Sequence, residues 1–123
     1  MLGVTAGLLA PLGLISTANA ANQDGNPQYK EFNFYYLSNI VGSLSDFENS
    51  KSNLSGYAFL SAGSGQGQAV KNNSASVSNN HPTKAVRVYF NSGYVGSYDN
   101  VNPITSRNLS VTYNENASFQ FQS

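Results

Sequence analysis

Apolar and polar residues alternate along four segments of the chain, which is the pattern of strands with one buried face. The apolar positions are 32, 34 and 36, then 86, 88 and 90, then 109, 111 and 113, and finally 117, 119 and 121. Turn-forming pairs such as Ser92-Gly93 and Asn102-Pro103 separate the segments, and no stretch keeps a helical period for three turns. The sequence therefore predicts an all-β sandwich or barrel of short strands.

The sequence also contains two copies of one pattern. Residues 34–43 match residues 88–97, which lie 54 positions further on, and residues 72–77 match residues 114–119, which lie 42 positions further on. The first copy therefore carries about a dozen extra residues, and the flexible glycine-rich segment 61–68 is the expected place for them. Residues 79–83 link the two copies.

Each copy contains a motif that resembles the Greek-key signature of the βγ-crystallins. The signature has an aromatic residue, four others, a second aromatic, one further residue and glycine, and Tyr89-x4-Tyr94-x-Gly96 fits it. Residues 35–42 repeat it, with Ile40 in place of the second aromatic. The resemblance covers residues 32 to about 121. It implies one domain over 32–123, a βγ-crystallin-like sandwich with one Greek key at about 32–80 and a second at about 84–123.

A narrower resemblance suggests a function. The sequence around residues 56–63, 70–73 and 114–118 is similar to that of small secreted bacterial proteins. These proteins are grouped with peptidase inhibitors related to the Streptomyces metalloproteinase inhibitor. It implies a non-enzymatic binding protein, expected to be a monomer, whose partner is an extracellular protease. Exposed loops on a rigid β scaffold commonly make such contacts. The expected partner-binding residues are Gly63, Ser64, Gly65, Gln66, Gly67 and Gln68.

The start of the chain has the features of an export signal. Residues 1–20 contain no charged side chain, are mostly apolar up to Ile15, and end in Ala18-Asn19-Ala20. A short apolar run followed by a small-x-small site predicts a signal peptide that is cleaved after Ala20. The mature protein is then expected to be extracellular and free of the membrane, with a flexible lead over residues 21–31.

Composition excludes several classes of function. The formal net charge is zero, which argues against binding of nucleic acid, because that requires a basic surface. The absence of cysteine excludes disulfides, zinc ribbons and thiol catalysis. His81 is the only histidine and lies in the polar linker, and the carboxylates Asp46, Glu48 and Asp99 are expected in surface turns. We therefore expect no catalytic residues and no enzymatic activity.

The βγ-crystallin resemblance also raises the possibility of calcium binding. Members that bind calcium carry an Asn/Asp-Asn/Asp-x-x-Ser/Thr-Ser stretch in each Greek key, and the present stretches depart from it at the sixth position. Glu115 is their only carboxylate, so calcium binding is expected to be weak or absent, and no other cofactor is required. A structural or calcium-binding module and a killer-toxin-like secreted protein remain alternatives. The candidate ligands are Asn72, Asn73, Ser76, Asn114, Glu115 and Ser118.

Overall fold

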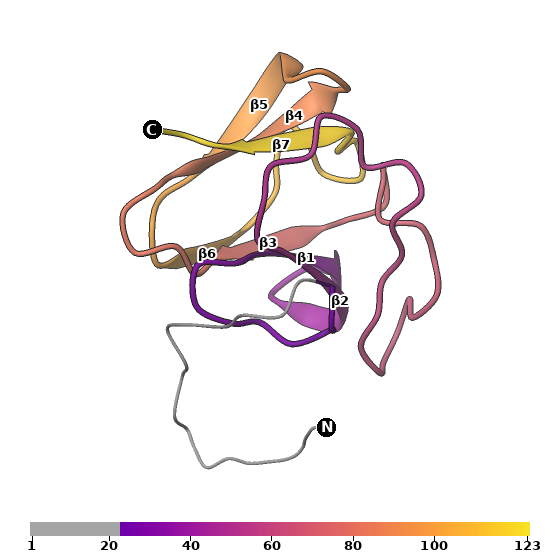
Figure 1. Ribbon diagram of the computed structural model, residues 1–123. Helices are drawn as coiled ribbons and strands as arrows, with labels where there is room; N and C mark the ends of the chain where they lie inside the picture. The colour runs from indigo at the N-terminus through magenta and orange to yellow at the C-terminus, as the bar shows by residue number, and fades with distance from the viewer. Residues whose placement is uncertain (1–22) are drawn as a thin grey trace.

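The computed structural model describes residues 23–123, which form two antiparallel sheets packed face to face (Figure 1). The predicted signal peptide, residues 1–20, lies outside the described residues. The first sheet has the strand order β2-β1-β3-β6 and the second has the order β5-β4-β7. The all-β prediction is confirmed. The strands are β1 (Phe32–Leu37), β2 (Val41–Phe47), β3 (Ser76–Asn79), β4 (Val86–Asn91), β5 (Val95–Val101), β6 (Thr105–Asn108) and β7 (Ser118–Phe121).

An aromatic core fills the space between the two sheets. The Phe34 ring centroid lies 5.7 Å from that of Phe47 and 5.3 Å from that of Phe119, both in edge-to-face contact. Each of these side chains is fully buried, which stabilises the fold by about 2–3 kcal/mol apiece. The predicted inward positions 32, 34, 86, 88 and 119 are all buried. Three predicted inward positions are exposed instead. Phe90 is 41% exposed and lies where the β4–β5 pairing becomes irregular, and Val111 and Tyr113 are 48% and 47% exposed.

The β1–β2 and β4–β5 hairpins have the same irregular shape. The strand pairing shifts between Tyr35 and Leu37 in the first hairpin and at the corresponding place in the second. Ile40 and Tyr94 both take a φ of 61°, and the glycines two positions later take φ values of 89° and 95°. Glycine tolerates this left-handed backbone without the steric cost that a Cβ brings. The repeated sequence motif therefore corresponds to a repeated backbone.

Strand β6 connects the two halves of the chain. It belongs to the second half by sequence, yet it pairs with β3 of the first half, so that Ser76 lies opposite Asn108 and Asn79 opposite Thr105. The corresponding position beside β7 holds a single bridge among the described residues, between Lys51 and Phe119. The sheets are therefore built from both halves.

The prediction of a strand over residues 109–113 is wrong. These residues form a turn that closes around Asp99, whose carboxylate accepts the backbone N–H groups of Ser110, Val111 and Thr112 at 2.9–3.3 Å. Arg107 forms an ion pair with the same carboxylate at 3.1 Å. Asp99 is only 3% exposed, so its expected place in a surface turn is also wrong. The carboxylate oxygens of Asp99 thus replace the carbonyl acceptors that a neighbouring strand would have offered to these N–H groups.

The lead before the first strand is anchored over residues 23–31, in contrast to the flexible segment that we expected. The backbone N–H groups of Asp24 and Gly25 donate to the two carboxylate oxygens of Asp46, at 3.1 and 2.6 Å. The Lys30 N–H donates to the carbonyl of Asn80 at 3.1 Å. Asp46 is fully buried by this lead, which corrects the expectation that it lies in a surface turn.

Candidate functional site

The glycine-rich segment expected to bind a partner forms the tip of an irregular hairpin. Ala58 and Ala69 form a bridge at its base. Beyond the bridge, the Phe59 N–H donates to the carbonyl of Gln68 and the Gly67 N–H donates to the carbonyl of Phe59, both at 2.9 Å. The loop is therefore ordered by its own backbone, while most of its side chains face solvent. The exposed residues in it are Gly63, Ser64, Gln66, Gly67 and Gln68.

The loop is also fastened to the first sheet. The Ser43 N–H in β2 donates to the carbonyl of Ser64 at 2.9 Å. On the other side, Gly65 lies so close to the Tyr36 ring that a Cβ at this position would overlap the ring. The Tyr36 ring packs in turn on Phe59, with centroids 5.6 Å apart. The sequence predicted flexibility from the glycines, and the structure instead uses one of them for close packing.

The two asparagine segments expected to bind calcium lie side by side where the halves of the chain meet. The Asn72 N–H donates to the carbonyl of Asn116 at 2.9 Å, and the Asn114 N–H donates to the carbonyl of Ser74 at 3.0 Å. The buried Asn116 side chain joins them further, because its Oδ1 accepts the Ser74 N–H and its Nδ2 donates to the Ser74 carbonyl. Sequence reasoning missed Asn116, although it lies within the second segment. The structure brings Asn72, Asn73 and Asn114 together.

The two serines named as calcium ligands hold the hairpins. The Ser76 hydroxyl donates to the carbonyl of Leu37 at 2.6 Å and accepts the N–H of Ile40 at 3.0 Å. Ser118 makes the same two bonds in the β4–β5 hairpin, at 2.6 and 3.1 Å. Both side chains are fully buried. Each hydroxyl therefore uses its proton and one acceptor position on the backbone turn.

Few oxygen atoms with a negative charge remain for a cation. Glu115 is exposed and is the only carboxylate in the two segments. Within residues 23–123, no group of three or more histidine, aspartate or glutamate side chains is arranged to hold a metal ion. Calcium takes six to eight oxygens and commonly several carboxylates. A calcium ion bound here would depend on amide and backbone oxygens.

A pocket of about 520 Å³ opens between the β1–β2 hairpin and the asparagine segments. The hairpin contributes Tyr36, Leu37 and Asn39, and the asparagine segments contribute Asn73 and Asn114. The chain neighbour of Asn114, Tyr113, completes the wall with a ring that is 47% exposed. No charged side chain lines the pocket. Sequence reasoning missed it, because its walls come from three segments that are far apart in the chain.

A pair of buried carboxyl groups lies beneath the N-terminal lead, and no pattern in the sequence indicated that the two groups would be buried together. Glu31 and Asp46 are both fully buried. Burial, helped by the charge of Asp46, raises the pKa of Glu31 to about 9. Burial also raises the pKa of Asp46 to about 6, although the N–H groups of Asp24 and Gly25 act in the opposite direction. Glu31 is therefore protonated at neutral pH.

His81 takes part in the turn between the two halves. Its Nδ1 accepts the backbone N–H groups of Thr83 and Lys84 at 3.2 and 3.0 Å. Burial, followed by the charges of Lys84 and Lys30, lowers the pKa of the imidazole below its ordinary value. The ring also lies 5.7 Å from the Phe121 ring. These contacts give the imidazole a structural role in the link.

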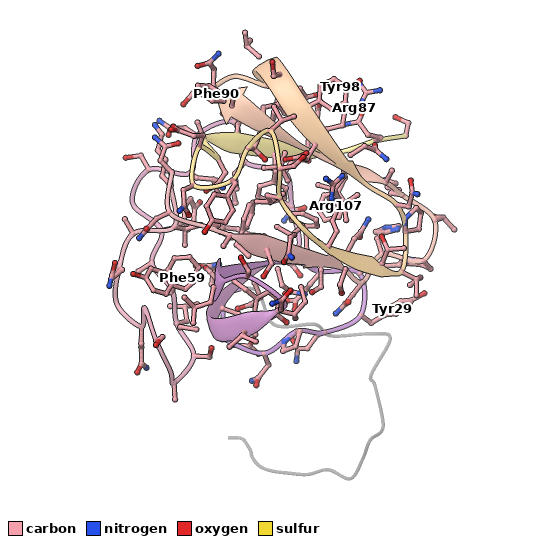
Figure 2. All side chains as sticks on the ribbon, turned by 180° about the vertical axis from the view of Figure 1, so that it is seen from behind. Tyr29, Phe59, Arg87, Phe90, Tyr98 and Arg107 are labelled. Atoms are coloured by element: carbon pink, nitrogen blue, oxygen red, sulfur yellow. The ribbon has the colours of Figure 1, made fainter. Side chains whose placement is uncertain are left out.

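Aromatic rings also cover part of the outer face of the second sheet. The Arg87 guanidinium lies 4.5 Å from the centroid of the Tyr98 ring, and the two side chains extend from neighbouring strands (Figure 2). Tyr98 is 43% exposed and packs on Tyr89 with centroids 5.6 Å apart. Such stacking of a cation on an aromatic ring stabilises the strand pair by about 0.5–1 kcal/mol.

No protein-family model matches the chain, and no curated protein matches it significantly. Among residues 23–123, the structure contains no helix long and apolar enough to cross a membrane.

Proposed function

We propose that this chain is a secreted, non-enzymatic binding protein with a βγ-crystallin-like fold that inhibits an extracellular protease through the loop of residues 63–68. The order β2-β1-β3-β6 places a strand of the second half in the first sheet, as expected when one Greek key gives a strand to the other, and it supports the proposed fold. The two hairpins of identical shape support it as well.

The observation that carries the functional proposal is the fixed conformation of an exposed loop. Its ends are closed by backbone hydrogen bonds around Phe59, and its middle is held by Ser43 and Tyr36. A loop that is ordered before it meets its partner loses little conformational entropy on binding. Gly65 contributes to this order, because the absence of a Cβ lets the loop pack closely on the Tyr36 ring.

The shape of the loop suggests how it inhibits. Gly63, Gly65 and Gly67 take φ values of 129°, 90° and 86°, so the backbone curls at every second residue. A protease substrate lies extended in the cleft, which requires negative φ along the chain. The curled loop therefore does not present a cleavable bond. We propose that it blocks the cleft as a rigid obstacle, which leaves the inhibitor intact.

Two glycine variants test this proposal. Gly65→Ala and Gly67→Ala place a Cβ on backbones of similar φ, but only the Cβ at position 65 meets a neighbour, the Tyr36 ring. We expect the purified chain to inhibit a thermolysin-like or a subtilisin-like protease, the Gly65→Ala variant to lose inhibition at least tenfold, and Gly67→Ala to lose much less. The assay is residual protease activity against inhibitor concentration, with the integrity of the inhibitor followed by mass.

Full activity of both proteases at a large excess of the undigested chain would overturn the inhibitor proposal. Equal loss of inhibition in the two glycine variants would overturn the proposal that the packing of Tyr36 orders the inhibitory loop. Growth inhibition of neighbouring microbes by the chain, without any effect on proteases, would favour the killer-toxin-like alternative.

A further inference from the structure

The pocket beside the β1–β2 hairpin offers hydrogen-bonding groups that the fold leaves unused. The Asn114 side chain is exposed at the pocket wall and makes no hydrogen bond to any residue in the described part of the chain. Asn73 donates through its Nδ2 to the Ala69 carbonyl at 3.0 Å, which leaves its Oδ1 as an acceptor. Asn39 accepts from Asn108 through its Oδ1 at 3.0 Å, which leaves its Nδ2 as a donor. The pocket therefore presents both donors and acceptors.

Apolar groups lie next to these amides. The Tyr113 ring is 47% exposed, and Leu37 and Val41, which also line the pocket, are 39% and 51% exposed. An aromatic ring offers a large apolar face at low entropic cost. The pocket thus combines an aromatic face, an aliphatic wall and planar amides in one space of about 520 Å³.

The absence of charge in this wall narrows the class of ligand. A phosphate or carboxylate ligand would meet no Lys or Arg side chain, and a metal ion would meet no carboxylate. An extended peptide would need a free strand edge, but β1 is paired with β2 on one side and with β3 on the other. A neutral ligand with many hydroxyl groups and apolar C–H faces fits the groups that remain.

We propose that this pocket binds a neutral carbohydrate, with the sugar ring against Tyr113 and its hydroxyl groups bonded to the amides of Asn39, Asn73 and Asn114. This site is separate from the outer surface of the 63–68 loop, and Tyr36 packs between the two. Because the three amides together offer donors and acceptors, the site can bind adjacent hydroxyl groups without any charge. The inference does not depend on protease inhibition.

The test uses the ¹⁵N-labelled full chain and three neutral disaccharides, namely cellobiose, maltose and N,N′-diacetylchitobiose. We expect at least one to shift the backbone amide signals of residues 37–41, 73 and 113–114, with a Kd on the order of 1 mM. Tyr113→Ala should weaken binding about tenfold, which corresponds to about 1.4 kcal/mol. Asn114→Asp, which removes the amide donors and tolerates the left-handed backbone of this position (φ 54°), should weaken it similarly.

Tyr98→Ala serves as the matched control, because Tyr98 is exposed to a similar degree and lies on the other sheet beside Arg87 (Figure 2). It should leave carbohydrate binding unchanged. The proposal is overturned if none of the three disaccharides shifts these signals at about 10 mM, roughly ten times the expected Kd. It is also overturned if Tyr98→Ala weakens binding as much as Tyr113→Ala does while both variants keep the native spectrum.

Discussion

Replacing the buried Glu31 by glutamine is expected to make the protein more stable at alkaline pH. The Glu31 Oε1 accepts the Gln28 N–H at 2.8 Å, but its Oε2 is buried with no hydrogen-bond donor beside it. An ionised carboxylate in this position is both desolvated and repelled by Asp46, so the folded protein keeps Glu31 protonated. Glutamine is neutral at every pH and retains the acceptor for Gln28.

The size of the effect follows from proton linkage. The pKa of Glu31 is raised from 4.5 to about 9, so the folded state binds one more proton than the unfolded state between these two values. Its contribution to stability is complete below about pH 4.5 and is lost as the pH rises towards 9. The loss is about 1.4 kcal/mol per pH unit, or about 2 kcal/mol between pH 7 and 8.5. In this window Asp46, whose folded pKa is about 6, is ionised in both states and adds nothing to the slope.

The assay is thermal unfolding at several pH values, for the wild type, Glu31→Gln and the control Glu115→Gln. Glu115 is exposed, so its replacement makes the same chemical change, from carboxyl to amide, without altering a buried group. A loss of 2 kcal/mol lowers the Tm of a domain of about 100 residues by roughly 8–16 °C. We expect this decrease in the wild type and in Glu115→Gln, and a flat profile in Glu31→Gln. Parallel decreases in all three proteins, or none in the wild type, would refute the reasoning.

Four further predictions concern Asp99, the two hairpin serines and calcium. Asp99→Asn should destabilise the fold by about 3 kcal/mol, because it removes the charge that holds the turn of residues 110–112, and urea unfolding measures this. Burial, the largest influence, raises the pKa of Asp99, but the hydrogen bonds from Thr112 and Ser110 together outweigh burial, and the pKa is lowered. The stability that Asp99 gives at neutral pH should therefore be lost only as the pH falls below about 4. The Asp99→Asn variant should not show this loss. Ser76→Ala and Ser118→Ala should each cost about 1–2 kcal/mol, and unequal losses would contradict their equivalent roles. Excess calcium should leave the Tm unchanged within error, whereas a clear increase would favour the calcium-binding alternative.

The local pattern of the sequence predicted one strand of the first sheet and two of the second. Strands β1, β4 and β7 lie where alternation indicated them, because each has one face against the core and one face away from it. The paired hairpins could be predicted too, since the glycine of each motif marks a backbone that few other residues adopt.

The sequence could not predict features that depend on distant partners. Residues 109–113 alternate like a strand, and only the carboxylate of Asp99, eleven or more residues away, turns their N–H groups inward. Glu31 looks like part of a solvated lead until Asp46 and the core bury it. The amides of the pocket come from the regions around residues 39, 73 and 114, so their proximity appears only after both halves have packed.

The placement of β6 has a consequence for how such a protein can arise. A polypeptide consisting of one half alone would leave an edge strand unpaired, since β3 takes its outer neighbour from the other half. Two copies of such a half could complete each other by trading this strand, which is the arrangement of a domain-swapped dimer. The present chain thus corresponds to a swapped pair whose subunits have been joined through residues 80–85. Cutting that link should yield two fragments that fold together and do not fold separately.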